Sequence, residues 1–173
     1  GKKNITLAHF NHGTDHGEEA AEFVYDYASD NHIKLISGKL STTKPTSKSW
    51  EEWWRDCRYD FFRNIEGPVI TAHHLDDVAE WWVFSSLHGE GKLIPRCRDN
   101  VIRPFLTTPK SSLLRWCDKN NVPYVVDPTN IQGPHARATL RTSVMPGAYM
   151  INPGLRTVIK KKLLAREIHN EEG

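Results

Sequence analysis

The chain has 173 residues and a formal net charge of only +2, which suits one globular domain with an appendage. Its three cysteines are scattered and no Cys-x-x-Cys occurs, which argues against a disulfide framework, a zinc knuckle and a cysteine-held iron–sulfur site. The same pattern favours a reducing, cytoplasmic compartment. No apolar run approaches the length that spans a bilayer, so no membrane partner is expected.

The first part of the chain predicts a strand, a helix and a second strand. Residues 5–10 read as a strand that ends in the polar turn His9-Phe10-Asn11-His12-Gly13, whose glycine can adopt a positive φ. Residues 17–31 carry a helical apolar stripe, and residues 32–37 form a second short strand. Residues 38–48 are rich in Ser, Thr, Lys and Pro and are expected to form a loop.

A second helix is expected after this loop. Ser49 and Glu52 have the spacing of a capping box, and an apolar side rich in tryptophan follows. Arg55 and Arg58 are three residues apart, so they are neighbours on the helix surface. They could serve a ligand, or they could form ordinary salt bridges, for example between Arg55 and Glu51. The sequence favours neither reading.

The stretch from residue 68 to residue 80 concentrates groups that can do chemistry. Pro68–Ala72 reads as a buried strand, and Asp76 is expected to cap the following helix. Two histidines, two aspartates and a glutamate therefore lie at the carboxyl end of a strand, where open α/β sheets bind ligands. The carboxylates could hold Mg²⁺, and His73 could donate to a phosphate or move a proton. The alternative is that the two aspartates only cap the helix and offset its dipole.

The following residues predict one more strand at Val101–Leu106 and a helix capped by Thr108, with Pro109 at its first position. Residues 123–127 are expected to be extended, and Asp127-Pro128-Thr129-Asn130 to form a turn. The alternation of strands and helices predicts an α/β domain over residues 1–133. Its parallel, Rossmann-like sheet would be covered by helices on both faces.

Residues 134–173 are expected to form a small basic helical appendage, with two helices broken at Pro146 and Pro153. No Asp or Glu occurs between Gly133 and Arg166. The basic residues of this segment are Arg137, Arg141, Arg156, Lys160, Lys161, Lys162 and Arg166. Such a block favours an anionic partner, nucleic acid first, and the alternative is a solvated helix face.

Six short motifs resemble the tRNA(Ile)-lysidine synthetases, within the wider group of PP-loop ATP pyrophosphatases. In family order they are His-Phe-Asn-His-Gly (9–13), Trp-Arg-Asp-Cys-Arg-Tyr (54–59), Ala-His-His-Leu-Asp-Asp-Val-Ala-Glu (72–80), Ile-Arg-Pro-Phe-Leu (102–106), Asp-Pro-Thr-Asn (127–130) and Ala-Arg-Ala-Thr-Leu-Arg (136–141). The lack of Cys-x-x-Cys also separates the chain from the related thiolases that carry an iron–sulfur cluster.

The resemblance implies an ATP- and Mg²⁺-dependent ligase that adenylates C2 of a tRNA anticodon cytidine, after which the amine of L-lysine displaces AMP. It implies catalytic roles for Asp77, His73, Arg55 and Arg137, and ATP binding by His9, Phe10, Asn11 and His12. It implies metal binding by Asp76, Asp77 and Glu80. By the resemblance and the basic charge together, RNA contacts are expected from Arg58, Arg141, Lys160, Lys161 and Lys162.

The sequence departs from the family at its start and within two motifs. The family's Ser-Gly-Gly-x-Asp-Ser loop, which cradles pyrophosphate, does not occur in these 173 residues. Trp54 stands where the family has a small residue, and Ala138 where it usually has Asn. We expect the loop and its central strand to come from another polypeptide segment. The other readings are a fragment of a longer chain or a rearranged protein. The competing functions are another PP-loop ligase with a different substrate, and a catalytically inactive RNA-binding remnant or regulatory partner.

Overall fold

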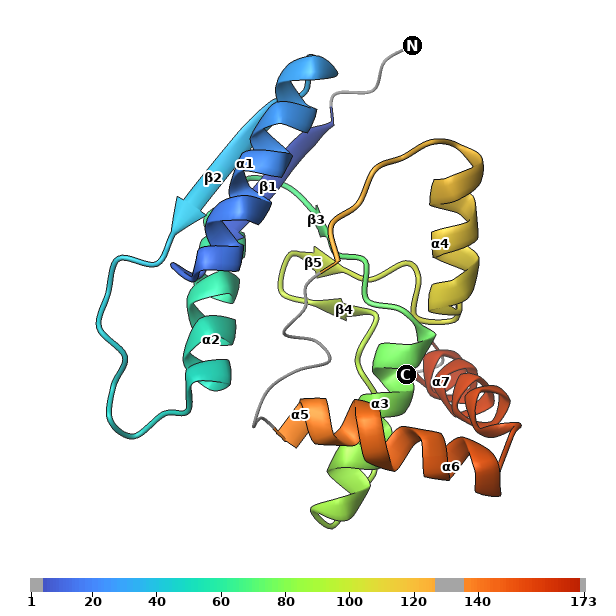
Figure 1. The fold of residues 1–173 in the computed structure, drawn as a ribbon. Helices are drawn as coiled ribbons and strands as arrows, with labels where there is room; N and C mark the ends of the chain where they lie inside the picture. Colours follow the sequence, from blue (N-terminus) through green and yellow to red (C-terminus); the bar gives the residue numbers. More distant parts are fainter. Residues whose placement is uncertain (1–4, 127–135, 172–173) are drawn as a thin grey trace. The chain divides into compact units, whose positions relative to one another are not determined.

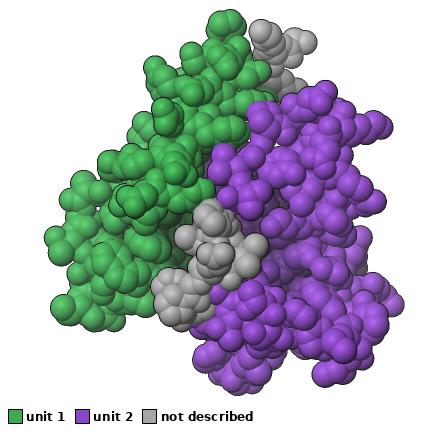
Figure 2. Space-filling view, viewed as in Figure 1, with its two compact units in different colours: residues 1–67 green, residues 68–173 purple. Residues whose placement is uncertain are grey.

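The computed structural model describes residues 5–126 and 136–171, which form helices and short strands (Figure 1). The chain divides into two compact units, residues 1–67 and residues 68–173 (Figure 2). None of the helices in these described ranges combines the length and apolarity that a bilayer crossing requires.

The first unit is a pair of parallel strands between two helices. Strands β1 (Thr6–Asn11) and β2 (Lys34–Lys39) pair along their full length, with His9 opposite Ser37. Helix α1 (Asp15–Asp30) connects them, and Figure 1 shows it lying along the strands. Thr14 caps this helix by accepting a hydrogen bond from the backbone N–H of Gly17, at 3.1 Å. This strand–helix–strand arrangement confirms the prediction, with boundaries moved by one or two residues.

Helix α2 (Trp50–Arg63) completes the first unit. Its N-cap is Ser49, whose hydroxyl accepts from the backbone N–H of Glu52 at 3.2 Å, as the sequence predicted. The Phe61 ring packs against Phe10, with 5.5 Å between ring centroids. A Cβ atom at Gly38 would lie only 2.7 Å from that phenylalanine ring. Glycine at this point of β2 therefore allows α2 to approach the strand pair closely.

The second unit contains a small three-stranded sheet. Strands β3 (Val69–Ile70) and β5 (Val101–Ile102) are parallel, and β4 (Cys97–Arg98) is antiparallel to β5. Val69 and Val101 are paired and buried, whereas Ile70 and Ile102 are paired and exposed. Both predicted strands are shorter than expected. The strand predicted at 101–106 ends at residue 102, and Pro104 beyond it has no N–H for a ladder.

The helices of the second unit are α3 (Leu75–Leu87), α4 (Lys110–Lys119), α5 (Ala136–Thr139), the π-helical turn η2 (Leu140–Val144), α6 (Met145–Ile151) and α7 (Leu155–Glu171). Buried residues of α3, η2, α6 and α7 contribute to one hydrophobic core. In α7, the side chains of Leu155, Ile159 and Leu163 recur every four residues and are buried against that core. The predicted domain boundary at residue 133 lies outside the described residues, and the helices after it pack with α3.

Three predicted helix details are wrong. Asp76 does not cap α3, because His74 occupies the N-cap and the helix begins at Leu75. Thr108 does not cap α4 either, since Pro109 is the N-cap and makes no side-chain cap bond. Pro146 does not break the C-terminal helix, because it lies in the first turn of α6, where a missing N–H costs little. The break at Pro153 is confirmed, and the predicted turn at 127–130 lies outside the described residues.

Candidate active site

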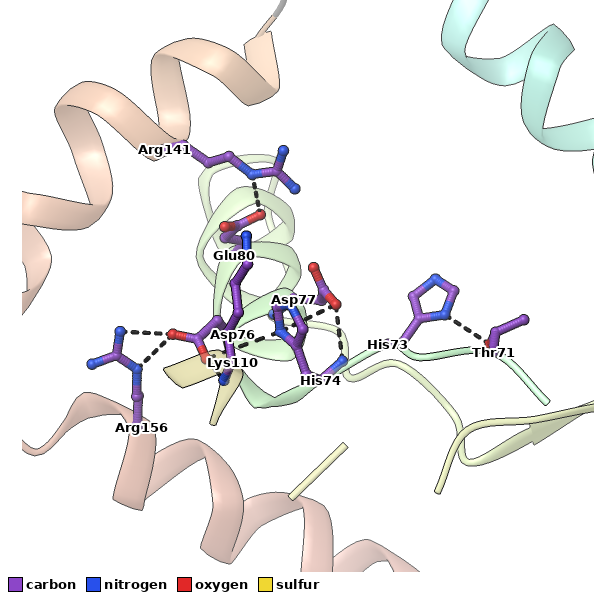
Figure 3. Close-up of polar contacts among 9 residues, drawn as sticks. All are labelled: Thr71, His73, His74, Asp76, Asp77, Glu80, Lys110, Arg141 and Arg156. Atoms are coloured by element: carbon purple, nitrogen blue, oxygen red, sulfur yellow. Dashed lines mark hydrogen bonds and ion pairs between the residues drawn. The ribbon is translucent and has the colours of Figure 1, made fainter. Parts of the chain in front are cut away.

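The turn between β3 and α3 carries the histidine pair and leads into the acidic first turn of the helix (Figure 3). The Thr71 hydroxyl lies 2.9 Å from Nδ1 of His73. Nδ1 of His74 accepts from the backbone N–H of Asp77 at 3.3 Å, and the Asp77 carboxylate accepts from the backbone N–H of His74 at 2.9 Å. This reciprocal capping box fixes the Asp77 carboxylate at the start of α3.

The Asp76 carboxylate joins three helices. One oxygen accepts from the backbone N–H of Lys110 at the start of α4, at 2.8 Å. The other accepts from Nε and Nη2 of Arg156 on α7, at 2.8 and 2.7 Å (Figure 3). Burial alone would raise the pKa of Asp76, but the Lys110 hydrogen bond and the Arg156 guanidinium outweigh it and hold the pKa below its usual value. Asp76 is therefore an ionised group that holds the unit together.

Glu80, one turn further along α3, is also paired with an arginine. Its carboxylate accepts from Nε of Arg141 at 2.8 Å (Figure 3). Burial raises the pKa of Glu80 above its usual value although Arg141 opposes that shift. Arg141 is a predicted RNA contact, and in this structure its guanidinium faces Glu80.

The three carboxylates were predicted to hold Mg²⁺, and their surroundings differ. Within the described ranges, no three His, Cys, Asp or Glu side chains come together in a way that could hold a metal ion. Asp76 and Glu80 are matched by guanidinium groups, whereas Asp77, whose side chain is 25% exposed, contacts His74. A nucleotide-bound Mg²⁺ needs only one or two carboxylates beside the phosphates. The residues fit that smaller requirement through Asp77, and the metal role of all three carboxylates remains a prediction.

Sequence reasoning missed two residues of the second unit that organise this region. The Arg156 guanidinium, beyond its contact with Asp76, lies 4.2 Å from the centroid of the Tyr149 ring. Arg103 is 2% exposed, and its Nη1 donates to the carbonyl oxygen of Pro95 at 2.7 Å. A lone arginine within an apolar run is a signal that could have indicated a buried role for Arg103. No local spacing signals a contact between Asp76 and Arg156, which are 80 positions apart.

The first unit holds the predicted ATP-binding residues at the carboxyl end of β1. Asn11 is 5% exposed, and its side-chain oxygen accepts from the backbone N–H of Gly13 at 2.7 Å. Gly13 has a φ of 74°, as expected for this turn. Nε2 of His9 and Nδ1 of His12 are buried and have no hydrogen-bond partner among the described residues. Such nitrogens are suited to a polar ligand, so this strand end fits a nucleotide.

His12 is held in its neutral form by its surroundings. Burial, followed by the nearby charges of Arg58 and His9, lowers the pKa of His12 to about 4. Its ring lies 5.2 Å from that of Phe10 and 5.6 Å from that of Trp54, between ring centroids. The neutral ring can donate from one nitrogen and accept at the other, which suits recognition of a base.

The His9 side chain also lines a hollow on the first unit. The hollow is open, has a volume of about 420 Å³, and lies between α1 and the two strands. Burial lowers the pKa of His9, so this ring too favours its neutral form. The lining residues are His9, Glu18, Ala21, Glu22, Tyr25, Leu35 and Ser37.

The other predicted site residues lie on helices. Arg55 and Arg58 are on α2 in the first unit, and the Arg55 guanidinium lies 5.6 Å from the centroid of the Tyr59 ring. Arg137 is on α5 in the second unit, one turn before Arg141. Lys160, Lys161 and Lys162 are exposed on α7. The structure thus gathers His73, Asp76, Asp77, Glu80 and Arg141 around the first turns of α3, and places the predicted ATP-binding residues at the end of β1.

Polar side chains follow the carboxyl end of β1, and polar and acidic side chains follow that of β3. This arrangement is typical of α/β proteins that bind ligands at strand ends. Residues 1–148 match the model of the PP-loop domain, and the chain belongs to that family. The α/β fold class and the family resemblance are therefore confirmed.

Curated relatives named tRNA(Ile)-lysidine synthase match most of this chain. The tRNA(Ile)-lysidine synthase of Thermotoga maritima is 31% identical over 91% of the chain and 41% of its own length. That of Persephonella marina is 29% identical over 88% of the chain and 36% of its own length. The chain therefore spans about two fifths of the length of these relatives.

A solved structure shares the fold. The U34-tRNA thiolase NcsA from Methanococcus maripaludis, solved with its [4Fe-4S] cluster, superposes with a TM-score of 0.68. The match covers 96% of this chain and 62% of the thiolase at 15% identity, so it is a likeness of fold.

Proposed function

We propose that this chain is the catalytic portion of an ATP-dependent tRNA-modifying ligase. The enzyme would adenylate C2 of an anticodon cytidine and join L-lysine to it. The proposal rests on the turn between β3 and α3 in this member of the PP-loop family. There the capping box holds Asp77 in place, while the neighbouring Asp76 and Glu80 are neutralised by arginines. The names of the relatives support the choice of lysine and tRNA.

Asp77 has the central role in this proposal. Its carboxylate would bind Mg²⁺ with the ATP phosphates, or the ammonium group of lysine. Mg²⁺, when bound, would neutralise charge that develops on the phosphates. His73 would donate to a phosphate oxygen, with its ring oriented by the Thr71 hydroxyl at 2.9 Å. Arg137 and Arg55 would provide further positive charge to phosphate or to the activated base.

The adenine half of ATP would be bound by the first unit. His9 and His12 would use their unpartnered nitrogens to bind the base or ribose, and Phe10 would contact the adenine ring. Asn11 holds the turn closed through its bond to Gly13, so its part is to shape the site.

The RNA contacts are assigned to cations on two helices. The exposed Lys160, Lys161 and Lys162 on α7 and the partly exposed Arg58 on α2 would meet phosphates of the tRNA. Arg141 would meet RNA only by sharing or leaving its pairing with Glu80.

We also propose that a polypeptide segment with a Gly-rich phosphate loop completes the site. The 173 residues contain no Ser-Gly-Gly-x-Asp-Ser sequence. In the described residues β1 pairs only with β2, and β3 only with β5, so both strands keep one edge that can accept a further strand. The same observation favours a second candidate function, an RNA-binding protein without catalysis, if no such segment is supplied.

The test is ATP-dependent incorporation of labelled lysine into tRNA by the chain alone and by the chain mixed with the loop-bearing segment of a lysidine synthase. We expect incorporation only in the mixture. Thermal melts with and without ATP–Mg²⁺ provide a second readout, and ATP should raise the melting temperature only in the mixture. Incorporation by the chain alone would refute the need for a segment. RNA binding with no incorporation in either sample would favour the non-catalytic function.

A further inference from the structure

A continuous row of aromatic rings crosses the first unit. It runs from Phe61 through Phe10, His12 and Trp54 to Trp50, with successive ring centroids 5.5, 5.2, 5.6 and 5.6 Å apart. The row begins at Phe61, which packs against the strand pair, and passes the turn that carries His12. It ends at Trp50, the first residue of α2. Its last ring, that of Trp50, is 51% exposed. A half-exposed tryptophan at the end of a packed aromatic row presents a flat apolar surface to solvent.

Lysines surround that end of the row. The Lys44 ammonium lies 5.5 Å from the centroid of the Trp50 ring, and the Lys48 ammonium lies 5.9 Å from that of Trp53. Lys48 is paired with Asp56, so part of its charge is already matched. Lys44 donates to the carbonyl oxygens of Pro45 and Lys48. Both acceptors are uncharged, so these two bonds do not neutralise its positive charge.

The sequence leading to Trp50 has a charge bias of its own. Residues 31–50 contain four lysines, Lys34, Lys39, Lys44 and Lys48, and no Asp or Glu. The loop is also rich in Ser and Thr hydroxyls, which commonly bind phosphate. An exposed indole beside a stretch that carries only positive charge is the combination found where single-stranded nucleic acid stacks its bases.

We propose that Trp50, Trp53, Lys44 and Lys48 form a platform on which an unpaired base of single-stranded RNA stacks. The base would stack on the exposed part of the Trp50 side chain, and the Lys44 ammonium, now 5.5 Å from the ring centroid, would move to meet the adjoining phosphate. This inference rests on the proposed RNA substrate, and it adds a contact that selects unpaired RNA over duplex. Trp54 connects the platform to His12, so the stacked base would lie at the end of the aromatic row that passes the nucleotide-binding turn.

The test compares two RNA hairpins in fluorescence anisotropy titrations of the full chain. One hairpin has an unpaired loop of ordinary nucleotides, and the other has the same loop with abasic sugars. Base stacking on an aromatic side chain typically contributes about 1–3 kcal/mol, so Trp50→Ala should weaken binding of the first hairpin by roughly 5- to 150-fold. Trp50→Phe should retain most of the affinity because it keeps a ring. Neither variant should change binding of the abasic hairpin.

Trp116→Ala is the matched control. Trp116 is an exposed tryptophan on α4, at 60%, and belongs to the other unit. Its removal should leave both titrations unchanged. Circular dichroism melts of each variant identify a loss of binding that comes from unfolding. If Trp50→Ala fails to fold, the wild-type chain still tests the inference, because it should bind the abasic hairpin more weakly than the ordinary one by a similar factor.

Three outcomes would overturn the inference. They are equal losses of affinity with the two hairpins, an equal loss from Trp116→Ala, and binding of an acidic peptide that depends on Trp50 as strongly as RNA binding does. The last outcome would indicate a protein partner. Lysine incorporation is a separate readout. A base-dependent RNA contact with no incorporation even by the chain mixed with the loop-bearing segment would support the platform while refuting the proposed ligase function.

Discussion

Asp76 and Arg156 form an ion pair at 2.7 Å, although they are 80 positions apart in the sequence. The pair ties the start of α3 to the start of α7, and the same carboxylate caps α4 through the Lys110 N–H. Two adjacent aspartates thus have different surroundings. Asp76 is bound to α4 and α7. Asp77 is held by the capping box, and a quarter of its side chain is exposed to solvent. Each can be tested by replacement with asparagine.

Asp76→Asn should lower the free energy of unfolding by about 1–3 kcal/mol, because the charge and one acceptor oxygen are lost from a partly buried carboxylate that binds two partners. Urea denaturation provides the measurement, and Asp26→Asn on the exposed surface of α1 is the control. The pKa of Asp76 is lower in the folded protein, so its contribution is present above the unfolded value of about 4. The stability difference between wild type and Asp76→Asn should therefore disappear as the pH falls through the folded pKa. A stability difference that does not shrink as the pH falls below about 4 would contradict this role.

Asp77→Asn should remove most ATP–pyrophosphate exchange while the melting temperature stays close to that of the wild type. Asparagine keeps an oxygen that can accept the His74 N–H, so the capping box survives, but the charge that would bind Mg²⁺ or lysine is absent. The assay uses the chain together with its loop-bearing segment. Full exchange activity in Asp77→Asn with an unchanged melt would remove Asp77 from the proposed mechanism.

His12 should titrate far below an ordinary histidine. Its pKa is lowered to about 4, so NMR should show a neutral imidazole from neutral pH down to about pH 5. Because the folded pKa lies below the unfolded value of about 6.5, the unfolded chain binds the proton first as the pH falls. Stability should decrease between about pH 6.5 and pH 4, and His12→Gln should remove that part of the decrease. A midpoint near 6.5 would show that the ring is solvated and unsuited to the binding role.

Replacing Lys160, Lys161 and Lys162 with Ala should weaken RNA binding and reduce its salt dependence. The slope of log K against log salt should become shallower by roughly 0.9 for each phosphate of duplex RNA that the variant no longer neutralises, by analogy with B-DNA. The helix should persist, because α7 packs through Leu155, Ile159 and Leu163 on another stripe. Lys119→Ala on the exposed end of α4 is the control. An unchanged slope would identify the three lysines as a solvated face.

The sequence was a good guide wherever a structure is decided by near neighbours. Ser49 caps α2 as predicted because its partner, the N–H of Glu52, is three residues away. The β1–α1–β2 unit was predictable because its apolar patterns match the periods of a strand and a helix.

It failed where the deciding partner is distant. Asp76 has the chemistry of a cap, and it does cap a helix, but that helix is α4, which begins at Lys110. His74 is the N-cap of α3 in place of Asp76, because its imidazole nitrogen can accept a hydrogen bond from a backbone N–H of the first turn, here that of Asp77. The pairing of Arg141 with Glu80 was likewise hidden from local sequence because the two lie 61 positions apart, and the RNA contact of Arg141 stays a prediction.

The π-helical turn at Leu140–Val144 has a consequence for how the C-terminal region can vary in length. Leu140 and Met145 are five residues apart and both are 4% exposed, an arrangement that an ordinary α-helix would put on different sides. The Met145 N–H bonds to the Leu140 carbonyl, five residues back, which brings the two side chains to one side. The segment thus accommodates one surplus residue without changing the core. Removal of that residue would place these two side chains four positions apart in an ordinary α-helix, where they again lie on one side, so Arg137 should keep its orientation relative to Met145.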